Sequence, residues 1–539
     1  MERAMTASEK SIRDTQRVCA GEEEYVHKRK KIVLESLRSL GINCAEDSVP
    51  RIAVLGSGGG ERAAMSLLGS LHQMEKDGLL NSVLYLAGIS GSTWSMAYLY
   101  GDPEWSTKMD KAISKLLDSE VDVHEALVWL NKRVDDEDFS LTDIWGLVTS
   151  AGIMKQMELW HPSDEVYKKP TNPYPVYCAI EKHFYRDGPP EGKWFEMSPH
   201  ESGFTELGLF VETSLLGSKF ESGRLVEMLP EMDMVKLQGI LGSALASEGK
   251  IREFIYNHMQ KYVHEAHESV HHAFHKFTSI FKSLVADLKA VVHLGEQTES
   301  NDVVMEVQSG CLDDKEAHYH QECQNLICVV EERKENLEEG HLKSFYVFVK
   351  KALHLIMKWE WGTTNNFLYK YQHSSMPKKL TSMEDIHLMD AGILMNVPYP
   401  PFLGEKRDID LIIAPEYSAG NLFETLTLAR DYAKELKKPF PDIPDKVLEE
   451  KDWPKDLYVF DGKEKAPTIV YLPLFNNKNC KDADEIKARM TEFSTFRGPL
   501  SKDEIRTLIE TSKENIKRNK ENIMEEIKKA AQRRNNKQK

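Results

Sequence analysis

The 539-residue sequence lacks an excess of basic residues, a long apolar run and an apolar leader. Its formal net charge of −16 argues against a nucleic-acid-binding protein, because binding a phosphate backbone normally requires a basic face. No run approaches the roughly 18 apolar residues that a membrane-spanning helix needs. The N-terminal stretch "MERAMTASEKSIRD" has no apolar core typical of a secretion signal, and Glu2 occupies the place of the glycine that myristoylation needs.

Cysteine is also scarce. The sequence has seven cysteines, an odd number scattered over a long chain, which does not favour a disulfide framework. This usage is typical of a reducing compartment, so we expect a cytoplasmic protein. The last residues, "NKQK", contain no prenylation box, so no C-terminal lipid anchor is expected. The seven are Cys19, Cys44, Cys178, Cys311, Cys323, Cys328 and Cys480.

What is present indicates an α/β fold. From Pro50 onward, "RIAVLGSGGG", "RAAMSLLGSLHQM" and "SVLYLAGISGS" follow the order strand, glycine-rich turn, helix, strand and sharp turn. This order predicts a central sheet of parallel strands with helices on both faces. The runs "IHLMDAG", "DIDLIIAPEY" and "PTIVYLPLF" are predicted to extend the sheet. We divide the chain into a helical lead (1–48), a main domain with cap or lid insertions (49–500, least regular at 246–345) and a basic tail (501–539).

Two histidine-rich stretches in the insertion could bind a metal. The first is a helical-spaced set, which we interpret as a surface helix because no closed set of ligands accompanies it. The second mixes histidines and cysteines at a spacing that matches no zinc signature. We therefore expect no metal and no cofactor. The two sets are His264, His267, His271 and His275, and His318, His320, Cys323 and Cys328.

The tail combines an apolar face with a basic end. Such a helix could lie on an anionic membrane surface, or it could dock on the domain with a frayed basic end. The residues alone leave both interpretations open. The apolar positions are Ile505, Leu508, Ile509, Ile516, Ile523 and Ile527.

Ser90 is the candidate nucleophile. In "GISGS" it has Gly88 before it and the small Ser92 after it, in the place of the final glycine of a G-x-S-x-G motif. A nucleophile on a tight strand-to-helix turn requires small neighbours so that its hydroxyl can reach substrate, and the following helix directs positive partial charge at a developing anion. The alternative is that Ser90 is an ordinary turn residue without a catalytic role.

The upstream loop "GSGGGERA" can supply backbone N–H groups. Gly56, Gly58, Gly59 and Gly60 precede a predicted helix, with Arg62 in its first turn. Such a loop can cradle a phosphate or form an oxyanion hole. It is not a Walker loop, since no Lys-Ser/Thr pair follows. Because Ser90 is a candidate nucleophile, we favour an oxyanion hole over a phosphate-binding loop.

The general base is predicted to be Asp390. An α/β-hydrolase triad places its histidine after the acid, but His387 is the last histidine of the chain and precedes Asp390. A triad that ends at His387 with an earlier acid stays conceivable. The simpler interpretation is a Ser90–Asp390 dyad, with Asp390 at a strand end in "IHLMDAG".

The motifs resemble those of the cytosolic phospholipases A2, which are related to patatin. "GSGGGERA", "GISGSTW" and "LMDAGILMNVPYPPFL" occur in the family's order, and "NPYPVYCA", "WFEMSPHESG", "GSKFESGRL", "WEWGTTNNFLYK" and "SAGNLFETL" continue the match from about residue 30 to about residue 480. No C2 module precedes the catalytic region, which is similar to the calcium-independent, gamma-type branch.

The resemblance implies an enzyme that hydrolyses acyl esters of phospholipids and lysophospholipids at a peripheral membrane surface. It implies a Ser90–Asp390 dyad, an oxyanion hole from the amides of Gly59 and Gly60, and contact of Arg62 and Arg407 with the substrate phosphate. An arginine fork suits a phosphate group, whereas a structural salt bridge is the alternative for either residue.

Two departures from the family pattern matter. Glu61 stands where the relatives have an apolar residue, and an acid beside Arg62 could pair with it and weaken the phosphate contact. The tail lacks the prenylation box of the gamma-type branch, so its basic end becomes the expected membrane contact. A catalytically impaired lipid-binding or interaction protein on the same fold is the rival interpretation.

Overall fold

The computed structural model describes residues 12–119, 123–134, 138–185, 188–243, 361–373, 376–495 and 500–538, with a few isolated positions outside these ranges. The two histidine-rich stretches, apart from Cys328, and almost all of 246–345 lie outside the described residues. Cys328 is an exposed helical residue. Of the helices that the structure describes, none has the length and apolar content needed to cross a membrane.

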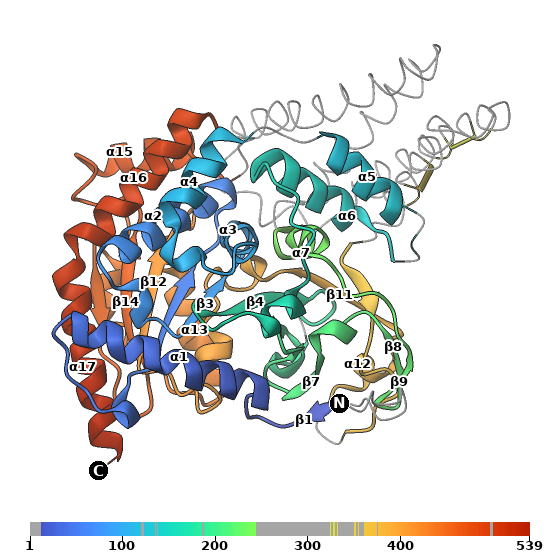
Figure 1. Cartoon of the computed structure of the whole chain (residues 1–539), viewed down its shortest axis with the longest axis horizontal. Helices are drawn as coiled ribbons and strands as arrows, with labels where there is room; N and C mark the ends of the chain where they lie inside the picture. The colour runs from blue at the N-terminus through green and yellow to red at the C-terminus, as the bar shows by residue number, and fades with distance from the viewer. Residues whose placement is uncertain are drawn as a thin grey trace.

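A 12-stranded mixed sheet forms the centre of the molecule (Figure 1). Its strands follow the order β1-β7-β6-β5-β4-β3-β2-β12-β14-β13, while β11 pairs with β4 and β10 pairs with β11. The block β4-β3-β2-β12-β14 is parallel, as the sequence predicts. Its apolar runs are buried along their whole length, which is typical of parallel strands covered on both faces. The other pairings are antiparallel, so the expectation of a parallel sheet holds for this block alone.

The parallel block consists of β2 (Ile52–Gly56), β3 (Tyr85–Gly88), β4 (Tyr174–Glu181), β12 (Leu411–Glu416) and β14 (Thr468–Pro473). The remaining strands of the sheet are β1 (Arg13–Asp14), β5 (Trp194–Met197), β6 (Glu201–Phe204), β7 (Leu209–Glu212), β10 (Thr363–Asn365), β11 (Asp385–Asp390) and β13 (Tyr458–Phe460). A separate hairpin joins β8 (Lys219–Glu221) to β9 (Arg224–Glu227).

Helices cover the sheet from two sides. In Figure 1, α2, α4 and α16 lie above the strands, α1 lies below them, and α17 runs along the left edge of the molecule, where it contacts β14 and β12. The helices are α1 (Ala20–Ser39), α2 (Gly60–Lys76), α3 (Gly91–Tyr100), α4 (Met109–Asp118), α5 (Val123–Arg133), α6 (Leu141–Leu147), α7 (Met234–Leu241), α12 (Lys378–Ser382), α13 (Glu424–Glu435), α14 (Asp445–Leu448), α15 (Ala483–Glu492), α16 (Lys502–Arg518) and α17 (Lys520–Gln538). The helices predicted at 1–48 and 501–539 are therefore present.

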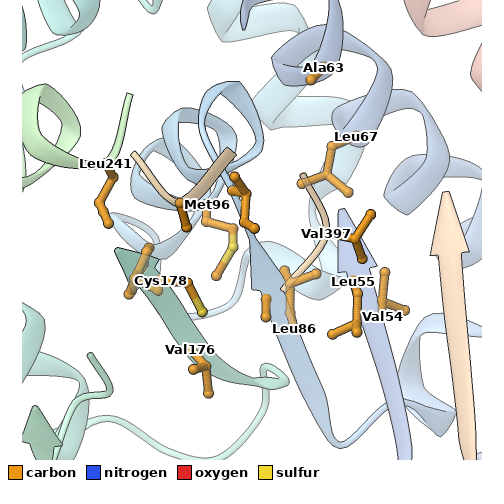
Figure 2. Packing of buried hydrophobic residues seen from close by; sticks show 14 of the residues in the cluster. Val54, Leu55, Ala63, Leu67, Leu86, Met96, Val176, Cys178, Leu241 and Val397 are labelled. Carbon is orange, nitrogen blue, oxygen red and sulfur yellow. The ribbon is translucent and has the colours of Figure 1, made fainter. Parts of the chain in front are cut away.

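The apolar core lies between the parallel strands and the helices that follow them. Figure 2 shows side chains of β2, β3 and β4 packed against residues of α2, α3 and α7. The labelled ones, Val54, Leu55, Leu86, Val176 and Cys178 on the strands and Ala63, Leu67, Met96 and Leu241 on the helices, are all buried. Close packing of this kind holds the strand ends, and the turns that follow them, in one arrangement.

The C-terminal tail is docked. Its predicted apolar face is buried, and α17 reaches β12 and β14. Ser501 caps α16 by accepting the Glu504 N–H at 3.3 Å. The helical segment is interrupted at Asn519, so two helices, α16 and α17, are present where the sequence predicted a single one. Near the end of α17, Arg534 is ion-paired with Asp408 and Asp410. In this arrangement the apolar face is not available to a membrane surface, so the structure shows the docked interpretation.

A buried carboxylate lies beside the C-terminal end of α3. The Glu158 side chain is 2% exposed, its Oε2 accepts the indole N–H of Trp160 at 3.0 Å, and its Oε1 has no partner among the described residues. Burial disfavours the charged form and raises the pKa of Glu158 from 4.5 to about 8.

We expect Glu158→Gln to stabilise the protein increasingly as pH rises from about 5 to about 8. In this window the folded state holds a proton that the unfolded state has lost, so the free energy of unfolding of the wild type falls by about 1.4 kcal/mol per pH unit from this group. The neutral amide has no such dependence. Urea denaturation at pH 5, 6.5 and 8 measures the difference, with the exposed Glu424→Gln as a control. A constant difference across the three pH values would contradict the prediction.

Candidate active site

Ser90 occupies the sharp turn between β3 and α3. Its backbone has φ 54° and ψ −125°, a region that a non-glycine residue rarely adopts, and its side chain is 4% exposed. Such strain persists only where surrounding structure imposes it, and it is typical of a nucleophile held on a strand-to-helix turn. The location of Ser90 therefore agrees with the sequence prediction, and its role as nucleophile stays a prediction.

The small neighbours of Ser90 are required by close contacts. A Cβ placed on Gly91 would lie 1.8 Å from the carbonyl oxygen of Gly60, so only glycine fits there. Ser92 lies against Gly56, and its hydroxyl donates to the carbonyl oxygen of Ser57 at 2.6 Å. Ser92 thus joins the nucleophile turn to the glycine-rich loop, which explains why a serine can replace the final glycine of the motif.

The glycine-rich loop leads directly into α2. Gly59 is the N-cap with φ 151°, and Gly60, the first helical residue, has φ 58°. The first N–H groups of a helix have no intrahelical acceptor, and the amides of Gly59 and Gly60 have no acceptor among the described residues. Because Gly60 touches residue 91, these amides lie beside the nucleophile turn. Their donation to an oxyanion stays a prediction.

Two strands bring Ser90 and Asp390 together from opposite directions. Along one edge of β4, Gly88 at the end of β3 pairs with Tyr177, and Asp390 at the end of β11 pairs with Ala179. The other edge of this part of β4 pairs with β5, so β3 and β11 share the first edge. Since β3 is parallel and β11 antiparallel to β4, their C-terminal ends face each other across two residues, about 7 Å of strand.

Asn396 lies between the two turns. A Cβ on Gly58 would lie 2.2 Å from Asn396 Oδ1 and 3.0 Å from Ser90 Cβ. A Cβ on Gly392 would lie 2.8 Å from the same oxygen and 3.0 Å from Asp390 Oδ1. The Asn396 amide nitrogen also donates to the Gly58 carbonyl oxygen at 3.2 Å. One carboxamide therefore touches the glycine-rich loop and borders both the nucleophile turn and the Asp390 turn.

Asp390 is fully buried and firmly held. Its Oδ1 accepts the Gly392 N–H at 2.8 Å, and its own N–H donates to the hydroxyl of Ser243 at 2.9 Å. Ser243 follows α7, so this helix supports the turn that carries the carboxylate. A carboxylate oriented in this way is suited to accept a proton.

His387 belongs to the opposite face of β11. Residues three apart along a strand point to opposite faces, and the buried positions of β11 are Ile386, Leu388 and Asp390. The His387 ring lies 3.1 Å from the Thr363 hydroxyl through Nδ1 and stacks edge-on with His183. The structure thus places Asp390, rather than His387, on the side of Asn396 and the nucleophile turn.

Arg62 lies beside the glycine-rich loop, and its side chain contacts protein acceptors. The residue is 1% exposed, and its Nε, Nη1 and Nη2 donate to Tyr417 O at 2.8 Å, Phe493 O at 2.5 Å and Thr495 Oγ1 at 3.0 Å. Burial lowers the pKa of Arg62 to about 10. The carboxylate of Glu61 accepts the Leu500 N–H at 2.9 Å, and its pairing with Arg62 stays a prediction.

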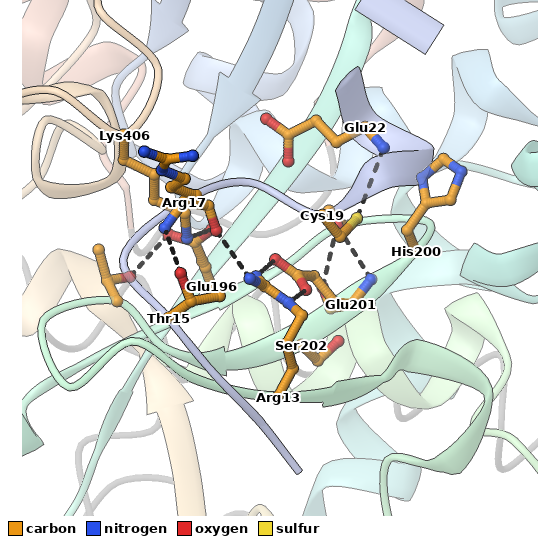
Figure 3. A network of polar contacts seen from close by, with 12 residues as sticks. Arg13, Thr15, Arg17, Cys19, Glu22, Glu196, His200, Glu201, Ser202 and Lys406 are labelled. Carbon is orange, nitrogen blue, oxygen red and sulfur yellow. Dashed lines mark hydrogen bonds and ion pairs between the residues drawn. The ribbon is translucent and has the colours of Figure 1, made fainter. Parts of the chain in front are cut away.

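Arg407 is the centre of a buried ion-pair network between α1, β5 and the loop after β11. Its side chain is 0% exposed, and it donates to both carboxylate oxygens of Glu22 at 2.8 and 2.9 Å and to Glu196 at 2.9 Å. Figure 3 shows Glu196 and Lys406, which form an ion pair, together with the nearby ion pair of Arg13 and Glu201. These contacts match the salt-bridge alternative for Arg407, and a phosphate contact stays a prediction.

The sequence analysis did not single out Asn396, Ser243 or Glu416. Asn396 belongs to the motif "LMDAGILMNVPYPPFL" and follows Asp390 closely in the sequence, so this proximity could have identified it as a candidate site residue. Glu416, at the end of β12, is 0% exposed and accepts the Ser418 N–H at 2.6 Å and the Tyr471 hydroxyl at 2.8 Å. For Ser243 and Glu416 no local signal exists, since only the fold gives them their partners.

Comparison with known proteins gives a consistent result. Residues 52–316 match the model of the lysophospholipase catalytic domain. The chain is similar to cytosolic phospholipase A2 gamma of Mus musculus, with 32% identity over 96% of this chain and 92% of that protein. It is also similar to the Homo sapiens gamma protein, with 32% identity over 94% of each chain.

Solved structures show the same fold. Human GIVD cytosolic phospholipase A2 matches with a TM-score of 0.67 and 21% identity, over 97% of this chain and 66% of that chain. The same human protein in complex with methyl gamma-linolenyl fluorophosphonate matches with a TM-score of 0.64 and 22% identity. This chain therefore spans about two thirds of the length of these solved chains.

Proposed function

The chain belongs to the cytosolic phospholipase A2 family, and we propose that it is a calcium-independent phospholipase A2 that hydrolyses fatty-acyl esters of glycerophospholipids through a Ser90–Asp390 dyad. The observation that carries this proposal is the meeting of β3 and β11 at one edge of β4. That arrangement supports the proposal, because it brings the turn of a strained serine and the turn of a buried carboxylate to one edge of β4.

In the proposed mechanism, Asp390 accepts the proton of the Ser90 hydroxyl while Ser90 Oγ attacks the ester carbonyl carbon. The amides of Gly59 and Gly60 donate to the carbonyl oxygen as it becomes negative, and the N-terminus of α3 adds favourable partial charge. The tetrahedral intermediate then expels the lysophospholipid alkoxide, which takes the proton from Asp390. An acyl-enzyme on Ser90 remains.

Water completes the cycle. Asp390 accepts a proton from the water that attacks the acyl-enzyme carbonyl, and the fatty acid leaves as Ser90 recovers its proton. The same intermediate supports lysophospholipase activity when the substrate has one acyl chain, and transacylase activity when an alcohol replaces water. Apart from water or an alcohol acceptor, the proposed scheme uses only groups of the chain and of the substrate.

The arginines enter the proposal in two different ways. Three of the five N–H groups of Arg62 contact protein, so in our proposal the remaining ones face the phosphate of a substrate near the glycine-rich loop. The guanidinium of Arg407 is bonded to two buried carboxylates, and we assign it a supporting role for the loop after Asp390. Substrate in a bilayer requires association with a membrane surface, which we propose to be peripheral.

The decisive experiment is hydrolysis by the purified chain in a calcium chelator. We expect fatty acid release from phosphatidylcholine vesicles labelled at either acyl position, and an initial burst of lysophospholipid that matches the amount of acyl-enzyme. A fluorophosphonate should label one serine, which peptide mass spectrometry should identify as Ser90. If the folded chain neither takes the label nor hydrolyses any phospholipid or lysophospholipid, the rival interpretation of a catalytically impaired lipid-binding protein is correct.

A further inference from the structure

The C-terminal helix α16 packs closely on α2, the helix that follows the glycine-rich loop. A Cβ on Gly69 of α2 would lie 2.1 Å from the Ser512 hydroxyl oxygen and 2.4 Å from the Ile509 carbonyl oxygen of α16. The buried residues Leu508 and Ile509 lie on α16, in the apolar core of the molecule. Because the two backbones touch, the position of α2 depends on α16.

The chain before α16 also contacts the glycine-rich loop. Arg62 donates to the Phe493 carbonyl oxygen and the Thr495 hydroxyl, and the Thr495 carbonyl oxygen would lie 2.7 Å from a Cβ on Gly60. Gly60 has φ 58°, so both its conformation and its contact with Thr495 exclude a side chain. Phe493 and Thr495, which follow α15, therefore contact the residues beside the amides that would form the oxyanion hole.

Glu61 connects the same loop to the start of α16. Its side chain is 5% exposed, and its Oε2 accepts the N–H of Leu500 at 2.9 Å. Leu500 directly precedes Ser501, the N-cap of α16. The carboxylate thus lies in the first turn of α2 and close to the N-terminus of α16, where the partial positive charge of both helices favours it.

The contact is of a kind that restrains a backbone strongly. A hydrogen bond from a backbone N–H to a buried carboxylate is shorter and stronger than one between neutral groups, and losing it leaves a buried donor unpaired. Glu61 directly follows Gly60, so movement of the oxyanion loop would require this bond to break. Oxyanion donors stabilise a transition state only when they are already in place.

We propose that Glu61 is a positioning residue: through Leu500 it fixes the oxyanion loop to the C-terminal segment and so sets the geometry of the Gly59 and Gly60 amides. This inference rests on the proposed function. It makes the C-terminal segment part of the catalytic scaffold, and it assigns the acid at position 61 a constructive role in place of the inhibitory one expected from the sequence.

The test compares three variants of the full chain. Glu61→Leu removes the acceptor and keeps the size, Glu61→Gln keeps an acceptor oxygen, and Glu510→Leu is the control, because Glu510 is an exposed residue of α16 that pairs with Lys513. For each we measure kcat and KM on phosphatidylcholine vesicles in a chelator, the rate of fluorophosphonate labelling and Tm. Hydrogen exchange of the Leu500 amide reports on the contact itself.

We expect Glu61→Leu to lower kcat and the labelling rate about tenfold, with KM within about twofold of the wild type, since a displaced oxyanion donor weakens the transition state rather than substrate binding. Glu61→Gln should retain most of the activity, and Glu510→Leu should match the wild type. The Leu500 amide should exchange faster in Glu61→Leu alone. If Glu61→Leu does not fold, Glu61→Ala takes its place with the same expected ratios.

Three outcomes would overturn the inference. One is an unchanged kcat in Glu61→Leu while the wild type hydrolyses phospholipid. Another is an equal loss of kcat in Glu61→Leu and Glu61→Gln, which would mean that the negative charge of Glu61, and not its hydrogen bond to Leu500, supports catalysis. The third is a Leu500 amide that exchanges alike in all variants. Failure of the proposed function is separate, because it shows as a wild type that neither labels nor hydrolyses, while hydrogen exchange still tests the contact.

Discussion

Alanine at Ser90 should abolish hydrolysis, and asparagine at Asp390 should lower kcat about 10⁴-fold. Removing a nucleophile or its base typically costs this much, because either loss disables the whole unit. Asp390→Asn is the sharper variant, since its amide oxygen can still accept the Gly392 N–H and thus preserve the turn. Steady-state kinetics with vesicle substrate measure kcat, and fluorophosphonate labelling should disappear in Ser90→Ala and slow strongly in Asp390→Asn.

His387→Ala is the control for this prediction. The ring lies on the opposite face of β11 and contacts Thr363 and His183, so its loss should change kcat less than about threefold. Circular dichroism and Tm must show that all three variants are folded. Near-full activity in Asp390→Asn together with strong loss in His387→Ala would restore the histidine-based triad.

Methionine at Arg407 should destabilise the protein by about 3–5 kcal/mol at pH 7. Removing one partner of a buried ion pair leaves its counter-charges unpaired in a low-dielectric interior, here the carboxylates of Glu22 and Glu196. Burial alone would raise the pKa of Glu196, yet the charges of Arg407 and Lys406 outweigh it and lower the pKa to about 2. The effect is measured as the free energy of unfolding in urea.

The destabilisation caused by Arg407→Met should depend on pH in a defined direction. Because Glu196 has a folded-state pKa of about 2, below its ordinary 4.5, it contributes stability above pH 4.5 that is lost as pH falls toward 2. The difference between wild type and Arg407→Met should therefore shrink in acid. Arg430→Met, which removes an exposed pair with Asp431, should cost less than about 0.5 kcal/mol. Full stability of Arg407→Met with a raised KM would instead support the phosphate contact predicted from the resemblance.

The parts of the site that could be predicted from the sequence are local. Small residues around Ser90, the glycines before α2 and the acid at the end of an apolar run each reflect a steric or capping need within a few residues. The apolar face of the tail could also be predicted from the sequence, because helical periodicity indicates which side of a helix is buried. Whether that face met a membrane or the domain was open, since both partners satisfy the same pattern.

The sequence by itself determined which residues stand at turns and which faces are apolar, because these depend on steric and periodic rules along the chain. The tertiary structure decided which of them meet. Strand direction was beyond local rules: β11 pairs antiparallel to β4, and this brings Asp390 to the end of β3. The same holds for the charges, because Arg407 and Glu22 are 385 residues apart and Glu61 and Leu500 are 439 apart. Contacts across such separations arise from packing of the whole chain, so no local pattern records them.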